Sequence, residues 1–202
     1  MRLIFWLSFL TLLYIYLSYP LFVWMLAQLF GREPLRREIT PDVSLLIPAY
    51  NEAAHIQAKL ENSLALDYPK ERLEIVVASD GSTDGTNAIV ERYAHKGVTL
   101  HAMPNNVGKA AMLSRVVPLL HGEIVVFSDA SSELAPDALR LLLSNFADPH
   151  VGCVSGLYRL LEHSDLRAEG EGLYWRYETF IKQQESRLHS ILGAHGAFYA
   201  IR

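Results

Sequence analysis

The chain has only one cysteine, Cys153, among its 202 residues. A single cysteine excludes an intrachain disulfide and a metal site built from several cysteines, and it fits a reducing compartment. The chain also has no surplus of basic residues, because its formal net charge at pH 7 is −4. Nucleic-acid binding favours a basic surface, so no nucleic-acid partner is expected.

Charged residues are absent from residues 3–30, where the sequence is almost entirely apolar. This run exceeds the roughly 20 residues needed to cross a bilayer. A signal-peptide core is shorter, about 7 to 15 residues, and no small-x-small cleavage site follows the run. We therefore expect residues 1–30 to form an uncleaved anchor in the inner or plasma membrane, as a single or first transmembrane helix.

Arginines are distributed unevenly around the expected anchor. Arg32, Arg36 and Arg37 follow it, whereas only Arg2 precedes it. Cytoplasmic flanks carry an excess of positive charge, so the rest of the chain is expected to lie in the cytoplasm. Residues 31–41 are interpreted as a basic linker and residues 42–202 as a globular domain.

Short apolar runs alternate with helical patterns throughout residues 42–145. Ile56, Leu60 and Leu64, for example, recur at helical spacing behind Asn51, which is a plausible helix cap. Such alternation with short joints predicts a doubly wound α/β domain with a mostly parallel sheet. Strands are expected at residues 43–48, 75–79, 98–103 and 124–127, and helices behind residue 51 and around residues 88–95, 110–120 and 136–145.

One phrase occurs twice in the chain, at residues 74–82 and 123–131, as Glu-Ile-Val-Val-x-Ser-Asp followed by small residues. Each copy has the pattern of a buried strand that ends at a carboxylate, Asp80 or Asp129. Ligands of open α/β sheets bind beyond the carboxyl ends of the strands. The two aspartates are therefore expected to face one ligand, although turn or cap roles are the alternative.

Glycine is missing where the common nucleotide-binding loops require it. Residues 48–52, after the first strand, contain no glycine, so a dinucleotide-binding fingerprint is excluded. Gly108 and Lys109 lack the upstream glycine and the following Ser or Thr of a P-loop. A bound nucleotide would consequently be held by side chains.

Four motifs follow one another in a familiar order: Pro-Ala-Tyr-Asn-Glu at 48–52, Ser-Asp-Gly-Ser-Thr-Asp at 79–84, Asn-Val-Gly-Lys at 106–109 and Ser-Asp-Ala-Ser at 128–131. Together they resemble the inverting family 2 glycosyltransferases, which have a Rossmann-like GT-A fold. The resemblance covers roughly residues 42–202. It is greatest to the membrane-bound cellulose, hyaluronan and poly-N-acetylglucosamine synthases, and it implies transfer of a sugar from a nucleotide donor, usually UDP-linked.

The resemblance also implies roles for individual residues. Pro48, Tyr50 and Glu52, with the carboxylate of Asp80, would hold the uracil and ribose of the donor. A carboxylate suits this role because it accepts hydrogen bonds and offers no competing donor. Lys109 would offset phosphate charge, although a solvated lysine at the start of a helix is the alternative.

Asp129 corresponds to the first acid of the family's Asp-x-Asp motif, which holds ribose and a divalent cation. Mg²⁺ or Mn²⁺ would bridge this carboxylate and the diphosphate, since both are hard ions that accept carboxylate, water and phosphate ligands. Ser131 stands where the second aspartate is usual. Metal use is therefore expected, with one fewer carboxylate than the family pattern.

A catalytic base is not identified within these residues. The resemblance places it in an acidic motif after a segment like residues 193–202, so the base is expected beyond Arg202 and the domain is expected to be incomplete there. A saccharide acceptor is favoured. The alternatives are transfer of one sugar to a lipid-linked acceptor, and a donor-binding module without catalysis.

Residues 165–190 have a helical pattern with an apolar face. Core packing is the simpler interpretation of that face. Alternatively, Tyr174, Trp175 and Tyr177 line an acceptor groove or a membrane-facing groove, because aromatic rings have apolar faces and polar edges. The histidines show no metal-site spacing, and His195, between two glycines, is expected to have a local role.

Overall fold

The computed structural model describes residues 1–157, 166–191, 193–194 and 196–202, with only the backbone of residues 166–173. His195 and the side chain of Leu173 lie outside the described residues. The chain forms two compact units. One comprises Met1–Pro34 and Tyr158–Gly193, and the other comprises Leu35–Leu157 and Ala194–Arg202.

The first unit contains a long N-terminal helix, Arg2–Phe30, that is long and apolar enough to cross a membrane. It consists of α1 (Arg2–Leu13), a π-helical turn η1 (Tyr14–Ser18) and α2 (Tyr19–Phe30). The helix α7 (Leu166–Leu188) packs against α2, and the hydroxyl of Tyr19 donates a hydrogen bond to Glu185. The same α2 buries Val23 and Ala27, whereas α1 buries no residue in the described structure. The apolar run of the sequence is therefore helical throughout.

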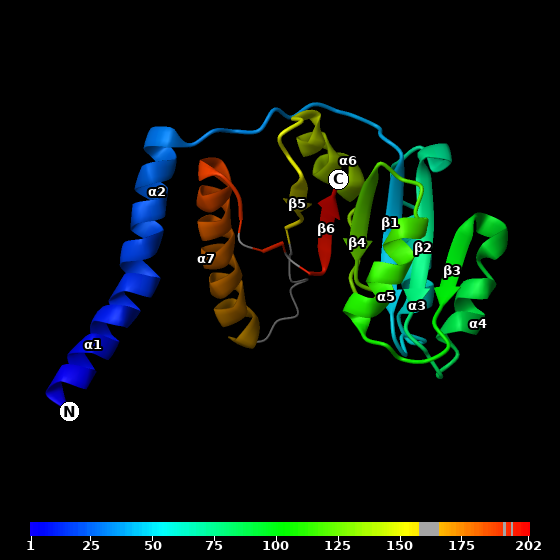
Figure 1. The fold of residues 1–202 in the computed structure, drawn as a ribbon, viewed down its shortest axis with the longest axis horizontal. Helices are drawn as coiled ribbons and strands as arrows, with labels where there is room; N and C mark the ends of the chain where they lie inside the picture. Colours follow the sequence, from blue (N-terminus) through cyan, green and yellow to red (C-terminus); the bar gives the residue numbers. More distant parts are fainter. Residues whose placement is uncertain (158–165, 192, 195) are drawn as a thin grey trace. The chain divides into compact units, whose positions relative to one another are not determined.

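The second unit is built on a six-stranded sheet in the order β3-β2-β1-β4-β6-β5 (Figure 1). β1 pairs in parallel with both β2 and β4, and β2 pairs in parallel with β3. β6 runs antiparallel to β4 and β5. The bounds are β1 Val43–Ala49, β2 Leu73–Ser79, β3 Val98–Ala102, β4 Ile124–Ser128, β5 Cys153–Ser155 and β6 Phe198–Ile201.

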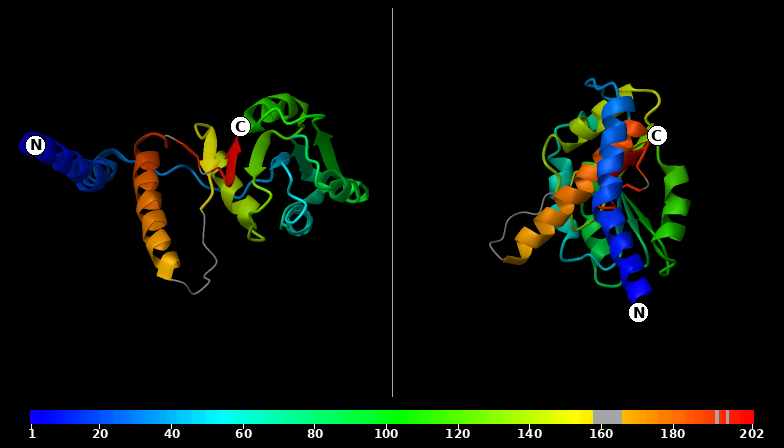
Figure 2. Two further views of the ribbon diagram at one scale, coloured as in Figure 1. Left: turned by 90° about the horizontal axis from the view of Figure 1, so that it is seen from below. Right: turned by 90° about the vertical axis from the view of Figure 1, so that its left-hand side faces the viewer.

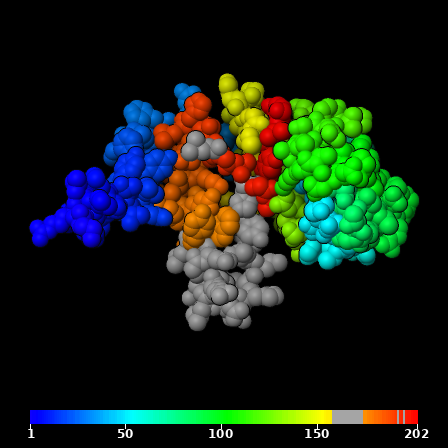
Figure 3. All heavy atoms as spheres, turned by 60° about the horizontal axis from the view of Figure 1, so that its bottom comes forward, coloured from blue at the N-terminus to red at the C-terminus, as the bar shows by residue number. Residues whose placement is uncertain are grey.

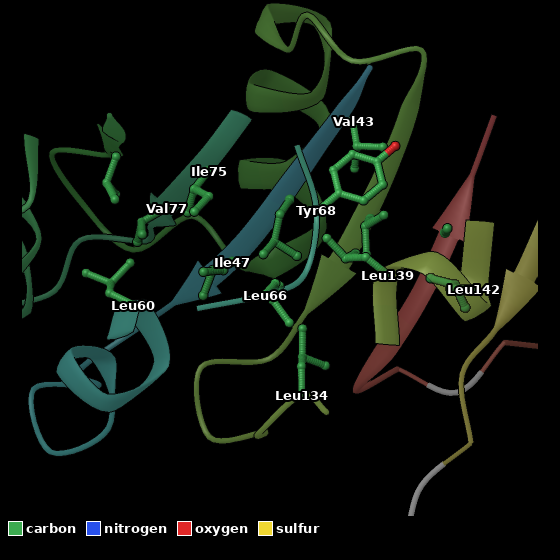
Figure 4. Close-up of a cluster of buried hydrophobic side chains, with 14 of the residues drawn as sticks. Val43, Ile47, Leu60, Leu66, Tyr68, Ile75, Val77, Leu134, Leu139 and Leu142 are labelled. Atoms are coloured by element: carbon green, nitrogen blue, oxygen red, sulfur yellow. The ribbon is translucent and has the colours of Figure 1, made fainter. Parts of the chain in front are cut away.

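Helices cover both faces of this sheet, as the left view of Figure 2 shows. Leu60 of α3 and Leu139 of α6 belong to the core on one face, whereas Met112 of α5 belongs to the core on the other. The larger core surrounds alternate residues of β1 and β2 (Figure 4). The helices are α3 Ile56–Leu64, α4 Thr86–Glu91, α5 Lys109–Val116 and α6 Ala138–Leu143, with short 3₁₀ turns η2 Lys70–Arg72, η3 Ala94–Lys96, η4 Val117–Leu119 and η5 Ser144–Ala147.

The predicted doubly wound, mostly parallel α/β architecture is confirmed, and so are the four predicted strands, which form the parallel part of the sheet. One local prediction is wrong: Asn51 does not cap α3, which begins at Ile56 after His55. The antiparallel strands β5 and β6 were not predicted. They are only three and four residues long, and so short a pattern gives little sequence signal.

A polar clamp joins three segments at the amino ends of the central strands. Glu74 of β2 accepts hydrogen bonds from the hydroxyl of Ser44 and from the backbone N–H of His121, the latter at 3.0 Å. The Nδ1 atom of His121 lies 2.8 Å from the same carboxylate, and Gly122 N donates to Ser44 Oγ at 2.8 Å. Burial raises the pKa of Glu74, but the hydrogen bonds from Ser44 and His121 outweigh burial and lower it overall.

We expect Glu74→Gln to reduce the free energy of unfolding at pH 7 by about 1 to 3 kcal/mol, because an amide replaces a charged acceptor. A lowered pKa stabilises the fold above the unfolded value and loses that contribution as the pH falls through the folded value. The difference between wild type and variant should therefore shrink below about pH 4.5. Urea unfolding at pH 7 and pH 3 measures it, with the exposed Glu71→Gln as the control. A pH-independent difference would contradict this account.

Candidate functional site

A pocket of about 370 Å³ lies at the carboxyl ends of β1, β2 and β4. This volume is within the range of small-molecule sites. Figure 3 brings this edge of the sheet forward, with the cyan atoms that follow β1 beside the green atoms of later segments. The structure brings all six sequence-predicted residues together in its wall. The full lining is Pro48, Ala49, Tyr50, Glu52, Asp80, Asn106, Gly108, Lys109, Met112, Asp129, Ala130 and Ser131.

The loop after β1 is held by the loop after β2. Asn51 has a left-handed backbone conformation, with φ of 55°, which asparagine tolerates better than most residues. Its side-chain oxygen accepts a hydrogen bond from Thr83 N at 2.9 Å, and its own N–H donates to Ser82 Oγ at 3.1 Å. Glu52 N donates to Thr86 Oγ1 at 2.9 Å. These cross-loop bonds set the backbone that presents Tyr50 and Glu52.

Asp80 is buried, and its carboxylate organises the loop before α5. Oδ1 accepts a hydrogen bond from Val107 N at 2.8 Å, and Oδ2 accepts one from Gly108 N at 2.9 Å. Gly81 makes this approach possible, because a Cβ there would lie 2.4 Å from Asn106 N. The carboxylate therefore positions the segment that leads directly into Lys109. Sequence reasoning assigned Asp80 to the ligand and did not foresee this structural task.

Lys109 and Asp129 form an ion pair inside the pocket. Lys109 Nζ lies 2.9 Å from Asp129 Oδ1, and both side chains remain partly exposed. Lys109 is the first residue of α5, whereas Asp129 follows β4. A cation and a carboxylate at the edge of a pocket can bind a phosphate and a metal ion respectively.

A buried lysine was missed by the sequence analysis. Lys59 of α3 is only 2% exposed, and its Nζ donates to Ser128 Oγ at 2.6 Å and to the carbonyl oxygen of Ser132 at 2.8 Å. Burial lowers the pKa of Lys59 to about 8, while the charges of Asp129 and Glu133 oppose the shift. Its burial could be inferred only from its position, because Lys59 lies three residues after Ile56 on the apolar face of its helix.

The oxygen atoms of the pocket wall fit a hard cation that takes its ligands partly from the protein and partly from a substrate. Among the described residues, no group of three or more His, Cys, Asp or Glu side chains could hold a metal ion by itself. Asp129 and Ser131 nevertheless supply a carboxylate and a hydroxyl in the same wall. Mg²⁺ and Mn²⁺ accept such oxygen ligands and complete their shells with phosphate oxygens and water. Asp129 and Ser131 are therefore the residues that would hold a hard divalent cation in this pocket.

The sheet order, the helices on both faces and the pocket at the strand ends define a GT-A-like α/β domain. Residues 44–202 match the family model "Glycosyl transferase family 2". The chain therefore belongs to glycosyltransferase family 2. This confirms the resemblance drawn from the four ordered motifs.

Two curated relatives make different kinds of product. The chain is 29% identical over 149 residues to beta-monoglucosyldiacylglycerol synthase of Synechocystis sp., a match that covers 71% of the chain and 31% of the relative. It is 30% identical over 126 residues to poly-beta-1,6-N-acetyl-D-glucosamine synthase of Staphylococcus aureus, covering 61% of the chain and 30% of that relative. The chain thus spans about a third of the length of these relatives.

A solved structure resembles most of the chain. It is the mannosyltransferase PcManGT of Pyrobaculum calidifontis in complex with GDP-Man and Mn²⁺, with a TM-score of 0.77 and 29% identity. The likeness covers 95% of this chain and 54% of the mannosyltransferase chain. A member of this structural class therefore binds a nucleotide sugar together with a divalent cation.

Proposed function

We propose that the chain is the donor-binding part of a membrane-anchored glycosyltransferase that transfers a sugar from a nucleotide donor, UDP-linked by preference, to a saccharide acceptor with inversion. The observation that carries this proposal is the convergence of Asp80, Lys109 and Asp129 in one pocket. The family membership and the nucleotide-sugar complex of the mannosyltransferase support it.

The two ends of the pocket are proposed to divide the donor between them. Pro48, Tyr50 and Glu52, with Asp80, hold the nucleoside. Each oxygen of Asp80 already accepts one backbone hydrogen bond, and a carboxylate oxygen has a second lone pair for a base N–H or a ribose hydroxyl. Lys109 would hold the diphosphate directly, and Asp129 would hold it through a cation.

A divalent cation, Mg²⁺ or Mn²⁺, is proposed to bind at Asp129. When bound, it supplies Lewis-acid stabilisation of the negative charge that develops on the leaving nucleoside diphosphate, worth several kcal/mol. The Lys109 ammonium now pairs with Asp129. Because the lysine side chain is flexible, the ammonium could leave Asp129 and pair with a phosphate oxygen of the donor. Inversion also needs a base for the acceptor hydroxyl. The base expected beyond Arg202 stays a prediction.

The membrane placement is also a proposal. Residues 1–30 would anchor the protein, residues 31–41 would link the anchor to the domain, and residues 42–202 would belong to the transferase domain in the cytoplasm. The apolar helix Arg2–Phe30 and the three arginines that follow it support this arrangement.

A lipid acceptor is the second candidate. An apolar helix that anchors the chain would bring it to the membrane, which contains lipid substrates. The glycolipid synthase relative also matches a larger share of the chain than the polysaccharide synthase relative does. A saccharide acceptor and a lipid acceptor use the same donor chemistry. Donor binding therefore cannot distinguish the two candidates, and a transfer assay with each acceptor would.

Calorimetric titration of the detergent-solubilised chain with UDP-glucose, UDP-N-acetylglucosamine and GDP-mannose, each with and without Mn²⁺, tests the donor proposal. We expect saturable binding of at least one UDP-sugar that weakens when Mn²⁺ is removed. Binding of GDP-mannose alone would overturn the preference for UDP. If none of the three donors bound with Mn²⁺ present, the proposed function would be wrong.

A further inference from the structure

Lys59 is a buried cation for which the proposed donor chemistry has no stated use. It lies on the inner face of α3, where the neighbouring helical positions are occupied by Ile56, Leu60 and Ser63. Lysine is almost never fully buried unless its charge is paired. Within the described part of the chain, Lys59 forms no ion pair, and its two hydrogen bonds go to the neutral oxygens of Ser128 and Ser132.

Those two oxygens belong to the turn that carries Asp129. Ser132 Oγ donates to the carbonyl oxygen of Asp129 at 2.8 Å, and it lies 3.2 Å from Ser128 Oγ. Asp129 N donates to the carbonyl oxygen of Ala197 at 3.2 Å. The ammonium of Lys59 therefore ties the first and last residues of a five-residue turn whose middle residues, 129–131, face the pocket.

Two lysines approach this turn from opposite faces of the sheet. Lys59 comes from α3, which packs on the core around Leu45 and Ile47, whereas Lys109 comes from α5, which packs on the core around Leu46. Lys109 contacts the Asp129 carboxylate directly, and Lys59 contacts the backbone and hydroxyl beside it. A buried ammonium acts at short range with little screening by solvent.

We infer that Lys59 is a positioning residue of the diphosphate site, holding the Ser128–Ser132 turn so that Asp129 and Ser131 face the diphosphate and its cation. This inference rests on the proposed donor function. Because Ser131 replaces the second aspartate of the family pattern, Asp129 is the single carboxylate of this turn. Binding of the cation would then depend strongly on the position of Asp129, which Lys59 helps to fix. At the nucleoside end, Asp80 and the backbone of Glu52 form hydrogen bonds with Val107, Gly108 and Thr86 and not with residues 128–132, so Lys59 should affect uridine less than the diphosphate.

The test separates the two ends of the donor. Wild type, Lys59→Met and Lys59→Gln are titrated with UDP plus Mn²⁺ by calorimetry and with uridine by ligand-observed NMR. If the donor titration shows that the wild type binds GDP-mannose and no UDP-sugar, GDP replaces UDP and guanosine replaces uridine in these measurements. Methionine keeps the length of the lysine side chain but removes both its charge and its hydrogen-bond donors. Glutamine removes the charge but keeps a neutral donor, so it replaces methionine in the test if the methionine variant does not fold. Lys70→Met is the matched control, because Lys70 Nζ also donates to backbone carbonyls, those of Leu64 and Leu66, outside the pocket.

We expect Lys59→Met to weaken UDP binding with Mn²⁺ by about 10-fold or more, since charged hydrogen bonds fix the turn, and to change uridine binding by less than about 2-fold. Lys70→Met should change neither. Equal weakening of UDP and uridine would reduce Lys59 to a general structural role, and unchanged UDP binding would also overturn the inference. A wild type that binds neither UDP nor GDP would instead refute the donor function itself.

Discussion

Asp129→Asn is expected to weaken UDP binding in the presence of Mn²⁺ by roughly 100-fold, which corresponds to about 3 kcal/mol. The asparagine side chain keeps the size of aspartate but loses the charge that pairs with Lys109 at 2.9 Å and that would hold the cation. A neutral amide oxygen is a poorer ligand for a hard ion, and its NH₂ group faces the Lys109 ammonium as a competing donor. Calorimetric titration of both proteins with and without Mn²⁺ measures the change.

The effect of Mn²⁺ should largely disappear in the same variant. Wild type should bind UDP more tightly with Mn²⁺ than without it, whereas Asp129→Asn should bind UDP nearly equally in both conditions. Glu133→Gln removes a nearby exposed carboxylate that does not line the pocket, and it should behave like wild type. A variant that retained both its affinity and its Mn²⁺ response would show that Asp129 does not hold the cation.

Asp80→Asn is expected to reduce the free energy of unfolding by about 2 to 4 kcal/mol, although it changes one oxygen to a nitrogen. Both carboxylate oxygens accept backbone hydrogen bonds, from Val107 and Gly108, so an amide can satisfy only one and must direct an N–H at the other. The side chain is buried, so the NH₂ group of asparagine has little room to turn away from the backbone N–H that it would face. Urea unfolding of the solubilised protein measures this loss.

The same substitution should also disorganise the segment that leads into Lys109. Donor binding is then expected to weaken even where the fold survives, because Lys109 begins its helix directly after Gly108. Asp137→Asn, at an exposed helix cap without a side-chain hydrogen bond, is the control and should cost less than about 0.5 kcal/mol. Equal stability of Asp80→Asn and wild type would contradict the two observed hydrogen bonds.

The sequence allowed the central sheet and the pocket to be predicted because their signals are local. Each repeated phrase combines a β-branched strand with the carboxylate at its end, and parallel pairing through β1 brings Asp80 and Asp129 to one edge. The loop motif at residues 48–52 and Lys109 follow other strands that end at the same edge. Strand direction alone therefore sufficed to gather these residues.

Features that depend on contacts between distant segments could not be predicted. Lys59 was hidden because one lysine on an apolar helix face is indistinguishable from a solvated one until Ser128 and Ser132 are placed beside it. The left-handed Asn51 was interpreted as a cap because its real partner, Thr83, is 32 residues away. Likewise, the hydrogen bonds from Val107 and Gly108 to Asp80 join segments 27 and 28 residues apart, so local sequence does not indicate them.

Hydrogen exchange measured by mass spectrometry, with and without UDP plus Mn²⁺, tests most directly whether this pocket is a donor site. We expect slower exchange in residues 48–53, 105–110 and 129–132, which carry the pocket wall, and no change in residues 70–75 and 119–123 at the opposite ends of the strands. Unchanged exchange at saturating UDP, or protection confined to residues 70–75 and 119–123, would contradict the assignment of the pocket to the nucleotide donor.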